Sequence, residues 1–378
     1  MNSIPLSYPE FNSKDFIAVH NAMNKINQND KDAVILEFED HLASFHQVKH
    51  AALFSSGSAA IHLALLALKI KSGDKVIVPT LTFAATAFPL LYLGANPVFL
   101  DVCEKTWTLD LDLLENYLRN CLPNDIPKLI ISVDLFGKTC DYDRLIDLSN
   151  RFQIPILIDS AEALGTKYKD TFSASLGNAS VISFNFNKIL TSTGGGVLLT
   201  NNDLINTKAR KLANQARENN HWYEHTEVGY NYRLSPILAA LGNSQLSRIN
   251  LLVSRRRKIR DFYFKSLSNI PGIEVNLDSE WEFSNAWLST VKFDRVLYPT
   301  GRDDVWNALK QENIESRFIW KPLHLQPVFK PFKSILTGVS EEIFDTSLCL
   351  PSGHKLNEMQ IQRICSILKK GLKLDKYI

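Results

Sequence analysis

The feature that most constrains the fold is a regular alternation of two kinds of segment between about residues 50 and 200. Short, continuously apolar runs such as "KVIVP", "NPVFLD", "KLIISV" and "IPILID" are separated by segments with helical spacing, such as "DLDLLENYLRN" and "YDRLIDLSNRF". Strands that are apolar throughout are typical of a parallel sheet whose faces are both covered by helices. The pattern therefore predicts an α/β fold, with a mainly parallel sheet between helices in a large domain.

Polar clusters follow five of the predicted strands. They read "SSGS", "PTLTF", "DLFGKT", "DSAEALG" and "NFNK". Because ligands of open α/β sheets bind beyond the carboxyl ends of the strands, we expect these clusters to converge on one site.

The alternation ends after "GYNYRLSPILAALGNSQLSRI". The next segment, "LLVSRRRKIRDFYFKSL", is predicted to be a long connecting helix. We therefore expect a large domain of residues 1–246 and a smaller C-terminal α/β domain of residues 247–378. The basic run from Arg255 to Lys258 is interpreted as a solvated helix face, with phosphate binding as the alternative.

Composition narrows the class of protein. A net charge of +2 over 378 residues argues against nucleic acid as a partner, which usually requires a strongly basic face. Five scattered cysteines without CxxC spacing indicate neither a disulfide framework nor a metal site, and the N-terminus lacks the pattern of a signal peptide. Residues 76–100 are uncharged, but three prolines divide them into short pieces, so we expect buried core there and no membrane span. These features predict a cytoplasmic protein.

Lys188 stands out because it is the only charged residue between Ser183 and Gly196. A solvated lysine in a loop is the simple alternative. However, Asp159 ends a very apolar strand, and a buried carboxylate needs a cationic or hydrogen-bonding partner. The turn at Gly57 and Ser58 precedes an apolar helix, whose N-terminus can bind phosphate, although simple serine capping also explains it.

These three features fit one small cofactor. The chain has neither a Walker loop nor a GxGxxG motif, so the phosphate is expected on a compact molecule. A desolvated lysine can condense with an aldehyde, and a buried aspartate can pair with a pyridinium nitrogen. Together they predict pyridoxal 5'-phosphate (PLP). Phe83 is a candidate for stacking on the pyridine ring, or else a core phenylalanine.

The same segments carry a family resemblance that runs almost from end to end. "LFSSGSAAIHLALLAL", "LIDSAEALGTKYKD", "SFNFNKILTSTGGG" and "WKPLHLQPVF" are similar to those of the DegT/DnrJ/EryC1/StrS aminotransferases, which act on nucleotide-linked sugars and have the fold-type I PLP fold. The resemblance implies that Lys188 forms the Schiff base and that Asp159 binds the pyridine nitrogen. The remaining implied cofactor contacts are Phe83 on the ring and, at the phosphate, Gly57, Ser58, Ser183 and Asn231. Asn231 would reach the phosphate from a neighbouring subunit, so a homodimer is expected.

Glu162 indicates a branch of this family, because many members have glutamine at that position, near the cofactor hydroxyl. Glutamate there resembles the branch that aminates C4 of UDP-linked 4-keto-6-deoxy-N-acetylhexosamines to make bacillosamine-type sugars for surface glycans or glycoproteins. The resemblance implies L-glutamate as the amino donor and a pyridoxamine 5'-phosphate form. His324 and Arg233 are candidates for binding the sugar or carboxylate groups.

Other interpretations of the sequence remain. The sugar could be aminated at C3, or carried by GDP or dTDP. A PLP-dependent sugar dehydratase or a non-catalytic regulator could share the fold, although related dehydratases have histidine where this chain has Lys188. A nucleotide-sugar binding protein without chemistry is an alternative of a different class.

Overall fold

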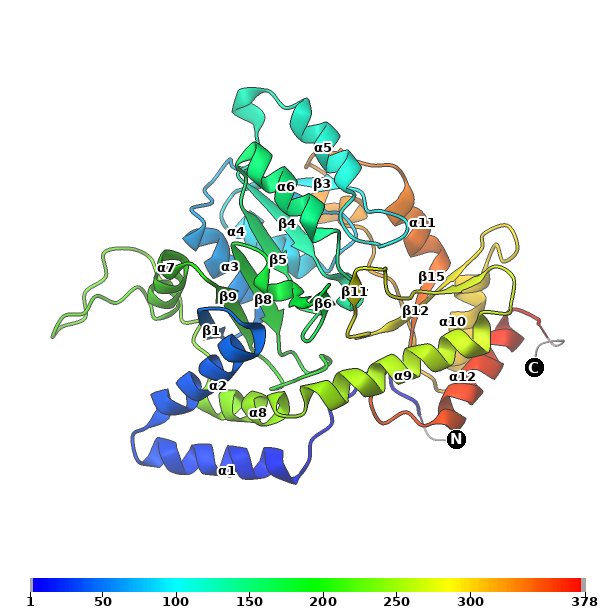
Figure 1. The fold of residues 1–378 in the computed structure, drawn as a ribbon, viewed down its shortest axis with the longest axis horizontal. Helices are drawn as coiled ribbons and strands as arrows, with labels where there is room; N and C mark the ends of the chain where they lie inside the picture. The colour runs from blue at the N-terminus through cyan, green and yellow to red at the C-terminus, as the bar shows by residue number, and fades with distance from the viewer. Residues whose placement is uncertain (1–2, 375–378) are drawn as a thin grey trace.

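The computed structural model describes residues 3–374, which are built around one eight-stranded sheet (Figure 1). From one edge to the other, the order is β1 (His50–Phe54), β9 (Gly196–Thr200), β8 (Ala179–Ser183), β5 (Ile156–Asp159), β4 (Leu129–Val133), β2 (Lys75–Pro79), β3 (Asn96–Leu100) and β14 (Ser334–Ile335). Every pairing from β8 to β14 is parallel, and β9 runs antiparallel to both of its neighbours. The predicted α/β fold with a mainly parallel sheet is confirmed.

Helices cover this sheet on both faces, as the continuously apolar strands require. On one face, Ile77 and Ile130 pack with α5 (Leu111–Arg119) and α6 (Tyr142–Phe152). On the other face, Val76 and Val78 belong to the core that includes α3 (Gly57–Ala67) and α7 (Asp203–Ala213). The short α4 (Phe88–Tyr92) adjoins α3. The alternation of β2 side chains between the two cores follows from the period of two along a strand.

In chain order, two further helices precede β1, and two follow α7. The first pair, α1 (Ser13–Asn27) and α2 (Lys31–His46), packs against α8 (Pro236–Leu246). The long helix α9 (Ile249–Leu267) then leads to the second sheet (Figure 1). Its basic run is not uniformly solvated as predicted, because the Arg256 side chain is fully buried.

The second sheet has four antiparallel strands, in the order β10 (Ile273–Val275), β12 (Ser289–Phe293), β15 (Ser347–Leu350) and β13 (Arg317–Phe318). It is accompanied by three helices, α10 (Gly301–Gln311), α11 (Val339–Thr346) and α12 (Glu358–Gly371). A small third sheet joins β11 (Glu282–Phe283), β6 (Lys167–Tyr168) and β7 (Thr171–Phe172).

The two parts of the chain are connected by strand pairing as well as by α9. β11 and β14 lie beyond residue 247, yet they pair with β6 and β3 of the preceding part. Ile4 in turn forms a bridge with Ile314. The division into two domains at residue 247 therefore remains a prediction. Strands from both sides of residue 247 pair with each other in two of the sheets.

Residues 76–100 contain β2, a 3-10 turn (Ala84–Thr86), α4 and β3. Within residues 3–374, no helix has both the length and the apolar character needed to cross a bilayer.

Candidate active site

A cavity of about 460 Å³ lies at the carboxyl ends of the parallel strands. Residues that follow β1, β2, β5 and β8 line it, which is the edge where the polar clusters were expected to converge. The cluster after β4 contributes less, since only Val133 at the end of that strand reaches the wall. The C-terminal part of the chain adds Trp287, Arg317 and Trp320.

Asp159 is the last residue of β5, and only 5% of its surface is exposed. Its Oδ2 accepts a hydrogen bond of 2.7 Å from the Thr86 hydroxyl, and its Oδ1 accepts one of 3.1 Å from the Ala161 amide. Burial raises the pKa of Asp159, while these bonds and the charge of Lys188 oppose the rise. Among the described residues, no cationic side chain lies within ion-pair distance of this carboxylate. Asp159 can therefore accept a hydrogen bond from a protonated group of a ligand in the cavity.

Lys188 extends from the loop after β8 into the same cavity. Its Nζ lies 3.7 Å from Oε1 of Glu162 and 3.9 Å from the ring centroid of Trp287. Burial lowers the pKa of Lys188, and the negative charges of Glu162 and Asp159 partly offset that effect. The amine therefore loses its proton more readily than a surface lysine, as a nucleophile requires.

Glu162 is held in position by the backbone. Its Oε2 accepts a 2.7 Å hydrogen bond from the amide of Phe136, which leaves Oε1 facing Lys188. Burial raises the pKa of Glu162, and the Lys188 charge opposes the rise. The cavity thus contains one amine that is largely shielded from solvent, beside two buried carboxylates.

The glycines after Lys188 allow two chain segments to approach each other closely. Gly195 has a φ of +106°, a conformation that favours glycine. A Cβ atom on Gly196 would lie 2.6 Å from the backbone nitrogen of Gly57. This close contact sets the first turn of α3, with Gly57 and Ser58, beside Ser183 on the cavity wall. First-turn amides of a helix lack acceptors within the helix, so this wall suits a phosphate.

Aromatic rings form another wall. Phe83 is 55% exposed, and its ring centroid lies 5.3 Å from that of Trp320. Trp320 in turn stacks on Phe136 at 6.0 Å, and Phe136 stacks on Trp287 at 6.2 Å. The sequence offered no local signal for Trp287, which follows Lys188 by 99 residues, or for Arg317.

Comparison with known proteins matches residues 12–369 to the model of the DegT/DnrJ/EryC1/StrS aminotransferase family. The chain belongs to this family. It is 41% identical over 340 residues to EpsN of Bacillus subtilis (strain 168), which is assigned as a pyridoxal phosphate-dependent aminotransferase. That alignment covers 89% of this chain and 87% of EpsN.

Two further relatives match nearly the whole chain. GDP-perosamine synthase of Escherichia coli O157:H7 is 31% identical over 372 residues, with 98% of this chain and 99% of the relative covered. The structure of Helicobacter pylori PseC, an aminotransferase involved in the biosynthesis of pseudoaminic acid, superimposes with a TM-score of 0.89 at 25% identity. It covers 98% of this chain and 100% of PseC. The predicted family and PLP-dependent aminotransferase class are therefore confirmed.

The residues of this family member fit PLP on structural grounds. The wall at Gly57, Ser58 and Ser183 suits the phosphate, and Asp159 is a buried carboxylate without an ion-pair partner among the described residues. Lys188 lies in the same cavity, with its pKa lowered by burial. These are the groups that the phosphate, the ring nitrogen and the aldehyde each require.

Three predicted site residues do not line the cavity within this chain. The His324 ring is bonded to the Thr80 hydroxyl at 2.7 Å and to Glu341 at 3.1 Å. Arg233 donates a 2.6 Å hydrogen bond to Asp32. Asn231 is exposed and bridges to Asn214 at the base of a loop that projects from the body after α7 (Figure 1).

A buried arginine supports the loop that carries Lys188. Arg256 donates to Nδ1 of His354 at 3.1 Å, to the Ser7 hydroxyl at 2.8 Å and to the Trp287 carbonyl. Ser7 and the Trp287 indole both donate to the carbonyl of Asn187, at 3.0 and 2.9 Å. Burial lowers the pKa of Arg256 to about 9. The chain start, α9 and the segment around Trp287 thus fix the peptide that precedes Lys188.

Proposed function

We propose that this protein transfers the amino group of L-glutamate to C4 of a nucleotide-linked 4-keto-6-deoxy sugar. The expected substrate is UDP-2-acetamido-2,6-dideoxy-hexos-4-ulose, and the product would serve in the synthesis of surface glycans or glycoprotein sugars. The observation that carries the proposal is the buried constellation of Lys188, Asp159 and Glu162 in a single cavity. The names of the relatives support a sugar as the amino acceptor.

The residues that line the cavity have distinct roles in this proposal. When bound, PLP supplies an aldehyde that captures amines and a ring that withdraws electrons. Asp159 would hold the protonated ring nitrogen, while Gly57, Ser58 and Ser183 hold the phosphate. Phe83 would pack on the ring. Lys188 would carry the proton between the substrate carbon and the cofactor, because its burial favours the neutral amine.

Glu162 would tune the pKa of Lys188, because its negative charge raises that pKa against the effect of burial. Its Oε1 is the carboxylate oxygen that faces the amine at 3.7 Å. Glutamate at this position supports the UDP-sugar branch, whereas the name of the perosamine synthase relative favours a GDP-linked sugar as the second candidate.

We also propose a homodimer with shared active sites. Asn231 and Arg233 lie at the base of the projecting loop, outside the cavity of their own chain. From a second copy, Asn231 would reach the phosphate, and Arg233 would approach the substrate. His324 would act on the substrate only indirectly, since Thr80 and Glu341 hold its ring.

The test is a panel of UDP-, GDP- and dTDP-linked 4-keto and 3-keto sugars supplied with L-glutamate. Purified protein with PLP bound should absorb visible light, and borohydride should attach the cofactor to Lys188. Glutamate alone should bleach the band and release 2-oxoglutarate, and a UDP-linked 4-ketosugar should restore it fastest. A protein that binds these sugars but never releases 2-oxoglutarate would instead be a binding protein or a dehydratase.

A further inference from the structure

Arg317 is the one cationic side chain besides Lys188 on the described wall of the active-site cavity. It lies on β13 of the second sheet, and 49% of its side chain is exposed. The other charged groups of the wall, Asp159 and Glu162, are buried carboxylates near Lys188. Once Lys188 is engaged by the cofactor, Arg317 is the positive charge that this wall offers to a substrate.

The guanidinium of Arg317 is held in place by a hydrogen bond from only one of its three nitrogens. Its Nη2 donates a 2.8 Å hydrogen bond to Oε1 of Glu315, while Oε2 of Glu315 accepts a 2.9 Å bond from the amide of Leu6. Nε and Nη1 of Arg317 make no hydrogen bond to any side chain or backbone group within residues 3–374. Arginine donates several hydrogen bonds in a fixed plane, so the two free nitrogens can bind an oxyanion.

A second cavity adjoins the first at this point. It has a volume of about 90 Å³ and shares Phe186, Asn187, Trp287, Arg317 and Trp320 with the larger cavity. Ser7 and Tyr8 of the chain start form part of its outer wall. Arg317 therefore lies on the wall that the main cavity shares with this recess.

We propose that Arg317 binds an oxyanion of a substrate, either a carboxylate of the amino donor or the diphosphate of the sugar nucleotide. This inference rests on the proposed function, because both half-reactions then bring an anion into the cavity. Arg317 is a specificity-determining residue in this scheme: it selects substrates with an anionic group at a fixed distance from the reacting carbon.

The test compares Arg317→Met and Arg317→Lys with the wild-type holoenzyme. Arg119→Met is the matched control, because Arg119 on α5 also donates Nη2 to a glutamate, at 2.7 Å, but lies away from the cavity. Calorimetry would measure the binding of two unreactive probes, glutarate and inorganic pyrophosphate. Loss of a hydrogen bond to a charged group should weaken one probe about tenfold or more in Arg317→Met, and less in Arg317→Lys.

The two probes distinguish the two sources of the anion. Weaker glutarate binding, with a slower bleaching of the visible band by glutamate, assigns Arg317 to the donor carboxylate. Weaker pyrophosphate binding, with a slower return of the band on adding ketosugar nucleotide, assigns it to the diphosphate. Wild-type affinity of Arg317→Met for both probes would overturn the inference. A wild-type protein that glutamate does not bleach would refute the proposed function instead, since probe binding needs no turnover.

Discussion

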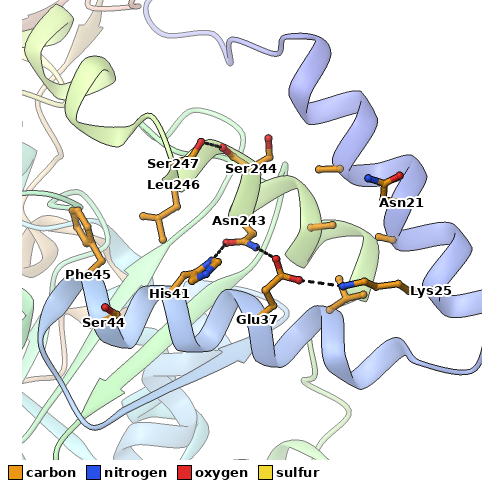
Figure 2. Close-up of a pocket in the computed structure, with 14 residues that line it drawn as sticks. Asn21, Lys25, Glu37, His41, Ser44, Phe45, Asn243, Ser244, Leu246 and Ser247 are labelled. Atoms are coloured by element: carbon orange, nitrogen blue, oxygen red, sulfur yellow. Dashed lines mark hydrogen bonds and ion pairs between the residues drawn. The ribbon is translucent and has the colours of Figure 1, made fainter.

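Two cavities in the described part of the chain differ in their chemistry, and the one with the greater volume has fewer groups that could react. A groove of about 700 Å³ lies between α1, α2 and α8 (Figure 2). Its polar side chains satisfy one another: Lys25 pairs with Glu37 at 3.2 Å, Glu37 accepts from Asn243 at 3.2 Å, and Asn243 bonds to His41 at 2.7 Å. In the smaller cavity, Asp159 is buried without an ion-pair partner among the described residues, and Lys188, whose side chain is 13% exposed, lies 3.7 Å from the carboxylate of Glu162.

The comparison of the two cavities indicates that a buried charge without a full set of partners, more than cavity volume, marks where a ligand binds. A chain gains nothing by burying a carboxylate without a cation unless something else supplies the partner. The exposed pairs of the groove need no such partner and contribute little free energy. Matched substitutions in the two cavities can test this interpretation.

The largest contrast is expected between two lysines. Lys188→Ala should abolish the visible absorption of the holoenzyme and reduce turnover by about 10²–10⁴-fold or more, since it removes the residue proposed to carry the proton. Lys25→Ala should leave both unchanged, because Lys25 is 43% exposed and pairs only with Glu37. Steady-state rates and absorption spectra would check both. A Lys188→Ala protein with near wild-type turnover would contradict the assignment of Lys188.

A smaller contrast is expected between two acids. Asp159→Asn should weaken PLP retention about 10- to 100-fold, because a hydrogen bond between charged groups is worth about 1.5–3 kcal/mol. Glu37→Gln should not alter retention. Dialysis against limiting PLP, followed by absorption, would measure it. Equal retention in both variants would show that the ring nitrogen does not depend on Asp159.

The same substitution should have the opposite effect on the stability of the cofactor-free protein. Because burial raises the pKa of Asp159, the native state binds its proton more tightly than the unfolded chain does. Stability from this group is therefore complete below the unfolded pKa and is lost as the pH rises through the folded pKa. Asp159→Asn should thus raise the free energy of unfolding at neutral pH, as urea titration of the cofactor-free protein would measure. A decrease would indicate that the carboxylate is already well paired.

Glu162→Gln should change the pH at which Lys188 loses its proton, while the amine itself is retained. The negative charge of Glu162 raises the pKa of Lys188 against the effect of burial, so its loss should lower that pKa further. In the cofactor-free protein, modification of Lys188 by an amine-reactive reagent should shift to lower pH. Peptide mass spectrometry would follow it, with Lys25 in the same molecule as the internal control. An unchanged pH profile would rule out Glu162 as the group that tunes the amine.

The smallest effect is expected in the groove. His41→Ala removes one exposed hydrogen bond to Asn243, so the free energy of unfolding should change by about 0.5 kcal/mol or less. PLP retention and turnover should remain at wild-type values. A clear loss of activity would mean that the groove does communicate with the active site, and the contrast between the two cavities would fail.

Local sequence signals were sufficient to predict which residues lie at the carboxyl ends of the strands, where the cavity is. Asp159 ends an apolar strand, Gly57 and Ser58 begin a helix, and Lys188 precedes a glycine run. In each case the adjacent residues in the sequence are enough to predict where the residue lies in the fold. Parallel strands then bring their carboxyl ends together without further information. This is why the fold class and the converging edge could be predicted.

The remainder of the site depends on packing between distant segments, which periodicity does not encode. Trp287 and Arg317 reach the cavity only because the second sheet docks beside the first. Arg256 stands in a basic run that is typical of a solvated face, yet it is buried by contacts with Ser7 and His354. His324 was a candidate for binding the sugar or a carboxylate, although histidines in proline-flanked loops are often structural, and its ring is bonded to Thr80 and Glu341.

The support of Asn187 by segments that are far apart in the sequence has a consequence for biosynthesis. Ser7 is synthesised before the main sheet and His354 after β14, and Arg256 bonds to both of them behind the loop that carries Lys188. A nascent chain that has folded its main sheet would still hold this loop without its final supports. The Lys188 amine should therefore acquire its final geometry only after His354 has been synthesised, and a variant in which the segment around Ser7 is displaced should lose activity without unfolding.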